Sequence, residues 1–277
     1  MGEFLVTGPA GDAVGDLAGR VGVRIVSRLA EAGLTVRALV SDPSRTRLPP
    51  HVETARGDLA APETLEPALR GVETVFLIWP DRGAAAPTPA VEVIAKHARR
   101  IVHLSGGRGP HREIERAIRW TGVPCTFLRP TGYAADTLRW AHQVRRGVVR
   151  QPYGTAARSP VHERDVAAVA VHVLTSAGHG GATYTISGPE TLTRAEQARI
   201  IGETVGHEVR WEEPPARTAR EELLAAWGDP AAVDDALAEW ASFAGAPERV
   251  TDTVQRLLGR RALTFRQWAG EHAADFR

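Results

Sequence analysis

The chain has 277 residues, of which 43% are apolar, enough for one large domain or one and a half with a substantial buried core. Its 34 basic and 33 acidic residues nearly cancel and are scattered, which argues against a nucleic-acid or membrane-surface partner. The single cysteine, Cys125, excludes an internal disulfide and a cysteine-based metal cluster, and neither a long apolar run nor a signal-peptide pattern is present. We therefore expect a cytoplasmic protein, monomeric or homodimeric, without a metal site.

The N-terminal stretch has the order strand, glycine-rich loop, helix. An apolar run at residues 4–6 is followed by glycines at positions 8, 11, 15, 19 and 22, and then by apolar residues at helical spacing up to Leu29. Such a loop lets backbone N–H groups approach a phosphate, and the helix N-terminus behind it adds partial positive charge. A dinucleotide pyrophosphate is the expected ligand.

Strands and helices then alternate. Residues 35–40, 52–55, 75–78, 101–104 and 124–128 read as strands, and helices are expected near 62–69, 90–97 and 111–120. This alternation predicts an α/β fold with a doubly wound parallel sheet, Rossmann-like, whose ligands sit beyond the carboxyl ends of the strands. The residues expected along that edge are Gly8, Ser41, Asp58, Trp79 and Ser105.

The remainder of the chain is mainly helical. We expect a helix over 133–146, a helix over 166–174, a strand over 183–186, and helices that begin after the capping residues Thr193 and Thr264. Between these two caps, three helical segments are expected near 218–227, 231–244 and 251–258. The predicted organisation is a dinucleotide-binding domain at 1–155 and a smaller, mainly helical, substrate-binding portion at 156–277, with strands that return to the sheet.

The usual proton donor of short-chain dehydrogenases is missing. That donor is a tyrosine with a lysine four positions on, which lowers the pKa of the hydroxyl. The only lysine here is Lys96, and the three tyrosines are followed at that spacing by Thr137, Ala157 and Gly188. If hydride is transferred, the proton must come from another group or from solvent.

Several short stretches, in this order and spacing, resemble one family. They are LVTG at 5–8, GDL at 57–59, VFLIWP at 75–80, EIERAI at 113–118, TFLRP at 126–130, SPVHERD at 159–165 and TFRQW at 264–268. Together they resemble the NmrA-like branch of the atypical short-chain dehydrogenases. That branch includes NAD(P)H-dependent quinone and azo reductases, and also redox-sensing regulators that bind the dinucleotide without turnover.

The resemblance implies a role for each candidate site residue. Glycines hold the pyrophosphate, Asp58 and Leu59 flank the adenine, and Trp79 and Pro80 lie on the nicotinamide side. The implied cofactor-binding set is Thr7, Gly8, Gly11, Gly19, Arg20, Val21, Gly22, Ser41, Arg45, Asp58, Leu59, Trp79, Pro80 and Ser105, and the implied catalytic set is Ser105, His111 and Tyr133. The alternatives are a turn residue at Asp58 or Ser105, a core aromatic at Trp79, a surface ion pair of His111 with Glu115, and packing at Tyr133.

Two departures from the family pattern leave alternatives open. After the second strand, Asp42 favours NADH through the ribose hydroxyl, whereas Ser41 and Arg45 together can hold the phosphate of NADPH, which we slightly favour. In the glycine loop, Gly8, Gly11 and Gly15 can form the fingerprint, with a helix that starts near Asp16 and contains the later glycines. The favoured alternative ends the fingerprint at residues 19–22 and makes 12–18 an acidic insertion, which either weakens cofactor binding or closes over a substrate.

These observations lead to one main hypothesis and two others. The first is an NAD(P)H-dependent oxidoreductase that reduces a quinone or another conjugated carbonyl compound without a Tyr/Lys acid. The second is a dinucleotide-sensing or regulatory binding protein. The third is a biosynthetic enzyme that uses the same fold for cyclisation or isomerisation.

Overall fold

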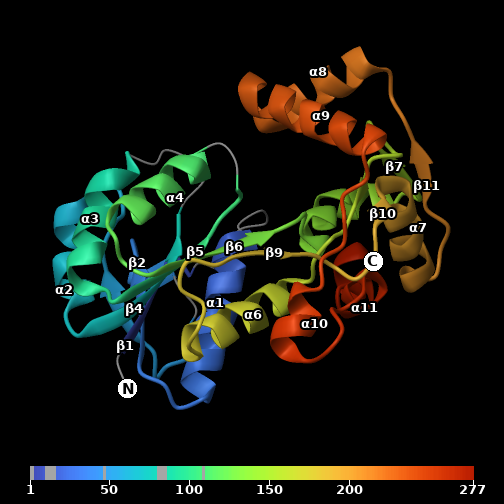
Figure 1. Ribbon diagram of the computed structural model, residues 1–277. Helices are drawn as coiled ribbons and strands as arrows, with labels where there is room; N and C mark the ends of the chain where they lie inside the picture. Colours follow the sequence, from blue (N-terminus) through green and yellow to red (C-terminus); the bar gives the residue numbers. More distant parts are fainter. Residues whose placement is uncertain (1–2, 10–16, 46–47, 80–85, 108–109) are drawn as a thin grey trace. The chain divides into compact units, whose positions relative to one another are not determined.

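The computed structural model describes residues 3–9, 17–45, 48–79, 86–107 and 110–277 (Figure 1). The chain divides into two compact units, of which the first comprises residues 1–130, 163–186 and 253–260, and the second 131–162, 187–252 and 261–277. The sequence predicted a boundary after residue 155, with strands of the later portion returning to the sheet. The chain instead passes between the units after residues 130, 162, 186, 252 and 260, because a strand and two helices from its later part complete the first unit.

Within the described residues, the first unit contains a sheet of seven strands, all parallel, in the order β3-β2-β1-β4-β5-β6-β9. The strands are β1 (Glu3–Thr7), β2 (Val36–Val40), β3 (Glu53–Arg56), β4 (Val72–Ile78), β5 (Arg100–Leu104), β6 (Cys125–Pro130) and β9 (Thr183–Ile186). The central strand β4 is buried along almost its whole length, as expected for a parallel strand covered on both faces. The predicted Rossmann-like sheet is confirmed.

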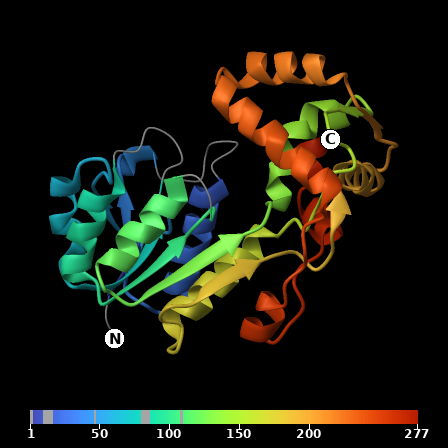
Figure 2. The same ribbon diagram turned by 45° about the horizontal axis from the view of Figure 1, so that its top comes forward.

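Helices cover both faces of this sheet. The helical elements are α1 (Leu17–Glu31), η1 (Pro43–Arg45), η2 (Pro62–Thr64), α2 (Glu66–Leu69), α3 (Pro87–His97), α4 (Pro110–Trp120), α6 (Glu163–Thr175) and α10 (Thr253–Leu258). Figures 1 and 2 show α2, α3 and α4 on one face and α1 with α6 on the other, where α10 packs against α6. In α1 the buried Val21, Ile25 and Leu29 recur every four residues, which gives the helix one apolar stripe toward the sheet.

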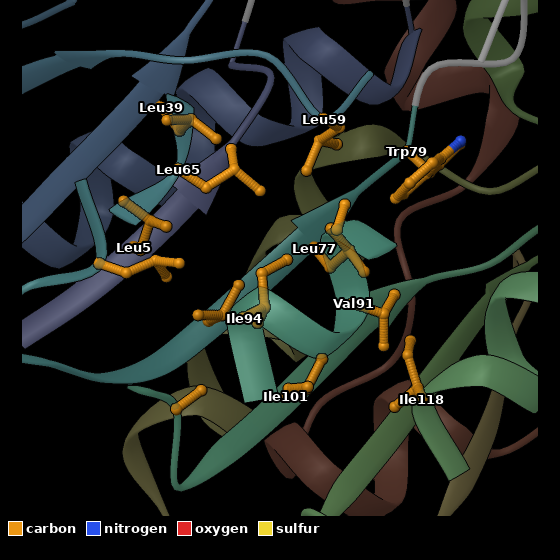
Figure 3. Packing of buried hydrophobic residues seen from close by; sticks show 14 of the residues in the cluster. Leu5, Leu39, Leu59, Leu65, Leu77, Trp79, Val91, Ile94, Ile101 and Ile118 are labelled. Atoms are coloured by element: carbon orange, nitrogen blue, oxygen red, sulfur yellow. The ribbon is translucent and has the colours of Figure 1, made fainter. Parts of the chain in front are cut away.

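A hydrophobic core lies between the sheet and helices α2 to α4 (Figure 3). Leu5, Leu77, Ile101 and Phe127 come from four neighbouring strands and are at most 1% exposed. Burial of each such side chain stabilises the fold by roughly 1.5 to 3 kcal/mol. The helices contribute Ala90, Val91, Ile94, Ile114 and Ile118 to the same core.

The second unit holds two small sheets, in which β10 pairs with β8 antiparallel and β11 with β7 parallel. Its elements are η3 (Ala134–Trp140), α5 (Ala141–Val144), β7 (Val148–Arg150), β8 (Ala157–Arg158), β10 (Leu192–Thr193), α7 (Arg194–Val205), β11 (Arg210–Glu212), α8 (Ala216–Trp227), α9 (Pro230–Gly245), α11 (Phe265–Glu271) and η4 (Ala273–Phe276). The helix predicted over 133–146 is instead a 3-10 helix followed by one α-helical turn. The Thr137 hydroxyl donates to the Ala134 carbonyl (2.8 Å), and such a bond competes with regular α-helical pairing.

Both predicted helix caps are confirmed. The Thr193 hydroxyl accepts from the Glu196 N–H (3.1 Å) at the start of α7, and Gly206 ends that helix with a φ of 87°. Thr264 caps α11 in the same way through Gln267. None of the helices in the described ranges is long and apolar enough to cross a membrane.

Candidate functional site

The carboxyl ends of β1 and β4 are tied together by Thr7. This side chain is fully buried; its hydroxyl donates to the Ile78 carbonyl (2.7 Å) and accepts from the Ile78 N–H (2.8 Å). Gly8 follows with a φ of 59°, which favours glycine, and its N–H donates to the Leu39 carbonyl (2.9 Å). Thr7 therefore supports the sheet edge through its side chain, and Gly8 turns the chain away from it.

Helix α1 begins at Leu17, so Leu17 and Ala18 are helical and are not part of a loop insertion. Gly19, Arg20, Val21 and Gly22 all lie inside α1, as the less favoured alignment of the glycine loop required, and Val21 is fully buried. Gly11 and most of the proposed insertion lie outside the described residues.

Gly22 permits the closest approach of α1 to the sheet edge. A Cβ atom at this position would lie 2.8 Å from Ile78 Cδ1 and 3.1 Å from Pro9 Cα. Only a glycine fits there without displacing its neighbours. Close packing of helix against strand is one role of glycine in dinucleotide-binding folds, so Gly8 and Gly22 fit an NAD(P) cradle.

The residues after β2 form a local turn. Ser41 is exposed, and Asp42 Oδ1 accepts from the Ser44 N–H (3.0 Å) and from the Ser44 hydroxyl (2.6 Å). Arg45 is the last residue of η1, and its side chain lies outside the described part of the structure. The Asp42 carboxylate thus holds the turn together, and the choice between NADPH and NADH stays a prediction.

The residues expected near the adenine and the nicotinamide divide between surface and core. Asp58 is exposed and forms a turn in which its Oδ1 accepts from the Ala60 N–H (2.8 Å), the alternative that the sequence had left open. Leu59 is 7% and Trp79 4% exposed, and both belong to the core (Figure 3). Trp79 therefore has the core position that the sequence disfavoured. Pro80 falls outside the described residues.

A buried carboxylate joins β5 to α4. Ser105 is 1% exposed, and its hydroxyl donates to Glu115 Oε1 (2.6 Å) while it accepts from the Gly107 N–H (3.0 Å). Arg129 donates to both oxygens of Glu115 (2.9 and 2.5 Å), and Arg119 donates to Oε2 (3.1 Å). Burial alone raises the pKa of Glu115, but the bonds from Arg129, Ser105 and Arg119 outweigh it and lower the pKa to about 2.

Two histidines meet beside this network. His103 is fully buried on β5, its Nδ1 lies 2.9 Å from the Leu77 carbonyl, and burial lowers its pKa to about 4. Because a carbonyl only accepts, the neutral ring carries its proton on Nδ1. Its Nε2 is then the acceptor that faces Nδ1 of His111 at 3.5 Å. Helix α4 thus directs His111 toward β5 and Glu115 toward Ser105, and both side chains contact groups of β5 and the loop after it, unlike the surface ion pair that the sequence left as an alternative.

Tyr133 belongs to the second unit. It precedes η3 and lines a cavity of about 550 Å³ within that unit. Its backbone N–H donates to Asp136 Oδ2 (3.2 Å).

Two features of the site were missed from the sequence. His103 stands between the apolar Val102 and Leu104 near the end of β5, and a polar residue in that apolar run was a usable signal for a buried polar contact. Arg194 lines the cavity of the second unit, and its position at the start of a helix gave no signal of burial. In the described ranges, no group of three potential metal ligands is found.

Comparisons with known proteins agree with this geometry. A family model described as NAD(P)H-binding matches residues 18–109. A reductase from Streptomyces griseus, named as acting on (4-alkanoyl-5-oxo-2,5-dihydrofuran-3-yl)methyl phosphate, is 39% identical over 93% of this chain and 96% of its own. This chain belongs to the NmrA-like family of atypical short-chain dehydrogenases.

Two further proteins similar to this NmrA-like chain are also named as reductases. An NAD(P)H azoreductase from Xenophilus azovorans is 32% identical over 93% of this chain and 96% of its own. Among solved structures, the triphenylmethane reductase of a Citrobacter species has a TM-score of 0.78 at 21% identity, and the match covers 98% of this chain and 99% of that one. The NmrA-like chain is thus an NAD(P)H-dependent reductase.

Proposed function

We propose that this reductase saturates an electron-poor conjugated double bond, in an unsaturated carbonyl compound or a quinone. The observation that carries the proposal is that the Ser105 hydroxyl already donates its hydrogen bond to the buried Glu115 (2.6 Å), so it does not serve as the proton donor to a substrate. With no Tyr/Lys pair in the chain, the acceptor must be one whose reduced form needs no strong acid. A quinone or a conjugated carbonyl meets this condition, because its carbonyl oxygens delocalise the negative charge.

The name of the Streptomyces griseus relative describes a suitable chemistry. In a 4-alkanoyl-5-oxo-2,5-dihydrofuran the ring double bond is conjugated with two carbonyl groups. When hydride adds at ring carbon 3, the electron pair moves to carbon 4 and is shared by both carbonyl oxygens. Water then supplies the proton at carbon 4. We propose that the substrate of this chain belongs to the same class of activated alkenes.

The chain's own residues would bind and orient the reactants. Gly8 and Gly22 would give the backbone access that a pyrophosphate needs, and the bound NAD(P)H supplies the hydride. His103 would hold the His111 ring in one orientation through their 3.5 Å contact, so that His111 faces the bound reactants. Ser105 would position the loop at residues 105–107 through its bonds to Glu115 and Gly107. Tyr133, which lines the cavity of the second unit, would donate a hydrogen bond to a ligand bound in that cavity.

A labelling experiment tests this function. Purified protein is incubated with reduced nicotinamide deuterated at carbon 4 and with an acyl-dihydrofuranone, a quinone or an azo dye, while a saturated ketone serves as the control. We expect deuterium at the β-carbon of the furanone, solvent hydrogen at the α-carbon, and no reaction of the saturated ketone. Cofactor binding without turnover of any acceptor would contradict the proposal and favour a dinucleotide sensor.

We propose further that NADPH is preferred to NADH. The support is that Ser41 is exposed, Arg45 follows in the same turn, and Asp42 Oδ1 is held by Ser44. Calorimetric titration should then show tighter binding of NADPH, and Arg45→Ala should weaken NADPH but leave NADH unchanged. Equal weakening of both cofactors would contradict a phosphate-binding role for Arg45. A monomer or homodimer in the cytoplasm is the accompanying expectation, which light scattering and cell fractionation test.

A further inference from the structure

The second unit encloses a cavity of about 550 Å³, which is within the range of small-molecule sites. Helices α8 and α9 supply an apolar wall, and η3, β7 and the start of α7 supply polar groups. The apolar lining includes Trp140, Ala219, Leu223, Ala226, Trp227 and Trp240. The cavity therefore suits a molecule with an apolar body. The polar groups of the cavity indicate which polar or charged group that molecule carries.

Arg194 is the unusual member of this lining. Its side chain is buried, with only 7% of the residue exposed, and its guanidinium carbon lies 3.9 Å from the ring centre of Trp240. Trp140 and Trp211 are also close, at 5.5 and 5.6 Å. Among the described residues its Nε is buried without a hydrogen-bond partner. A guanidinium has five N–H donors, and aromatic faces do not satisfy them.

Two other arginines around the cavity form ion pairs with glutamates. Arg158 pairs with Glu239 (2.9 Å) and Glu248 (3.2 Å), and Arg150 pairs with Glu222. No ion pair is found for Arg194 among residues 110–277, all of which the structure describes. Arg194 is thus a buried cation that has no direct ion pair in this part of the chain, although the carboxylates of Asp136, which also lines the cavity, and Glu213 act on it at longer range.

The surroundings of Arg194 are unfavourable for a positive charge. Arg194 is the first residue of α7, where the helix dipole repels a cation. Burial lowers its pKa to about 9, and Arg158 lowers it as well, while Asp136 and Glu213 act in the opposite direction. The guanidinium stays protonated at neutral pH. A cation that is buried, unpaired and placed at a helix N-terminus lowers stability, so a bound anion is the simplest reason for it.

We infer that this cavity binds a small molecule by an anionic group, a phosphate ester or a carboxylate, held by Arg194, with its apolar body against α8 and α9. The planar guanidinium matches both anions with two parallel hydrogen bonds. A polar side chain also lines the cavity: Gln143 Oε1 accepts from the Arg150 backbone N–H (2.6 Å), which leaves its amide hydrogens for a ligand. The inference rests on the proposed function only in taking this molecule to be the substrate.

The test measures binding without cofactor or turnover. Hexyl phosphate, hexanoate and hexanol are titrated into the full-length protein, and binding is followed by tryptophan fluorescence and calorimetry. We expect one or both anions to bind at least about tenfold more tightly than hexanol, as charge-assisted hydrogen bonds provide. The preferred anion identifies the group, and binding no tighter than that of hexanol would overturn the inference.

Variants assign the effect to Arg194. Arg194→Met keeps an apolar stem among the indoles, so it should remove the preference for the anion and leave the melting temperature unchanged or higher. Arg194→Lys should retain part of the preference. The control Arg199→Met, on the exposed side of α7, should bind like the wild type. If Arg194→Met melts lower and still prefers the anion, Arg194 is structural and the inference fails.

The outcome is separable from the reductase proposal. Anion binding that depends on Arg194, without reduction of any tested acceptor, would keep the inference and refute the proposed substrate class. Reduction of the panel without anion binding would do the opposite.

Discussion

Replacement of Glu115 by glutamine removes the charge at the centre of the β5–α4 network and keeps the shape of the side chain. The side chain of Glu115 is 2% exposed, and it accepts from Ser105, Arg119 and Arg129. A glutamine offers one acceptor oxygen and turns an NH₂ group toward an arginine. One guanidinium therefore loses its partner, and the loop after β5 loses part of its anchor.

The expected loss of unfolding free energy follows from the pKa. A fall from the ordinary 4.5 to about 2 corresponds to at most about 3 kcal/mol of stabilisation. The arginines are 35% and 51% exposed, so water partly replaces the lost bonds and screens the pair. We expect Glu115→Gln to cost about 2 kcal/mol at pH 7, below the loss of about 3 to 5 kcal/mol for a fully buried pair.

Urea unfolding followed by circular dichroism measures this loss at several pH values. Because the folded pKa is depressed, the stabilisation is complete above pH 4.5 and disappears as the pH falls toward 2. The gap between wild type and Glu115→Gln should narrow in the same window. The control Glu113→Gln, on the exposed side of α4, should cost less than about 0.5 kcal/mol. A gap below about 0.5 kcal/mol, or one independent of pH, would refute the reasoning.

Three further changes test other contacts. Gly22→Ala should destabilise the protein by about 1 to 3 kcal/mol in urea unfolding, because the added Cβ would lie 2.8 Å from Ile78. As the control, Gly270→Ala should be neutral or stabilising, because a Cβ added there would have no atom within 4 Å. Equal effects of the two substitutions would contradict the packing argument. Thr7→Val should cost about 1 to 2 kcal/mol, since two buried β4 backbone groups lose their partner; an unchanged midpoint would contradict that role. In the folded protein His103 stays neutral down to about pH 4, whereas in the unfolded chain it takes up a proton below about pH 6.5. The free energy of unfolding of the wild type should therefore fall by at most about 3 kcal/mol as the pH is lowered from 6.5 to 4. His103→Gln should flatten that slope, and an unchanged slope would assign it to other groups.

The sequence predicted the parts of the fold that depend on local pattern. Apolar runs such as the one ending at Ile78 identified the strands, and Thr193 and Thr264 identified two helix starts, because periodicity and capping act within a few residues. The start of α1 was predicted less well. Glycines disfavour a helix by about 1 kcal/mol each, but the approach of Gly22 to Ile78 is a contact between distant residues, and only the structure shows it.

The candidate site was less predictable, since it depends on which face of a strand or helix is covered. Trp79 and Leu59 are apolar residues at strand ends, where a ligand contact and a core contact have the same sequence pattern; the structure buries both. Ser105 and Glu115 are ten positions apart, and nothing in their spacing predicts a bond of 2.6 Å. Arg194 lies beside indoles from three different segments, so its burial could not be read from any one of them.

The interleaving of the two units constrains how the chain can fold during synthesis. β9 joins the sheet beside β6 more than fifty residues later in the chain, and α10 packs against α6 later still. Until residue 186 has left the ribosome, the backbone groups along one side of β6 have no strand to pair with, a condition that favours association with other chains. The first unit is complete only after residue 260, so nascent chains released early would be expected to depend on chaperones.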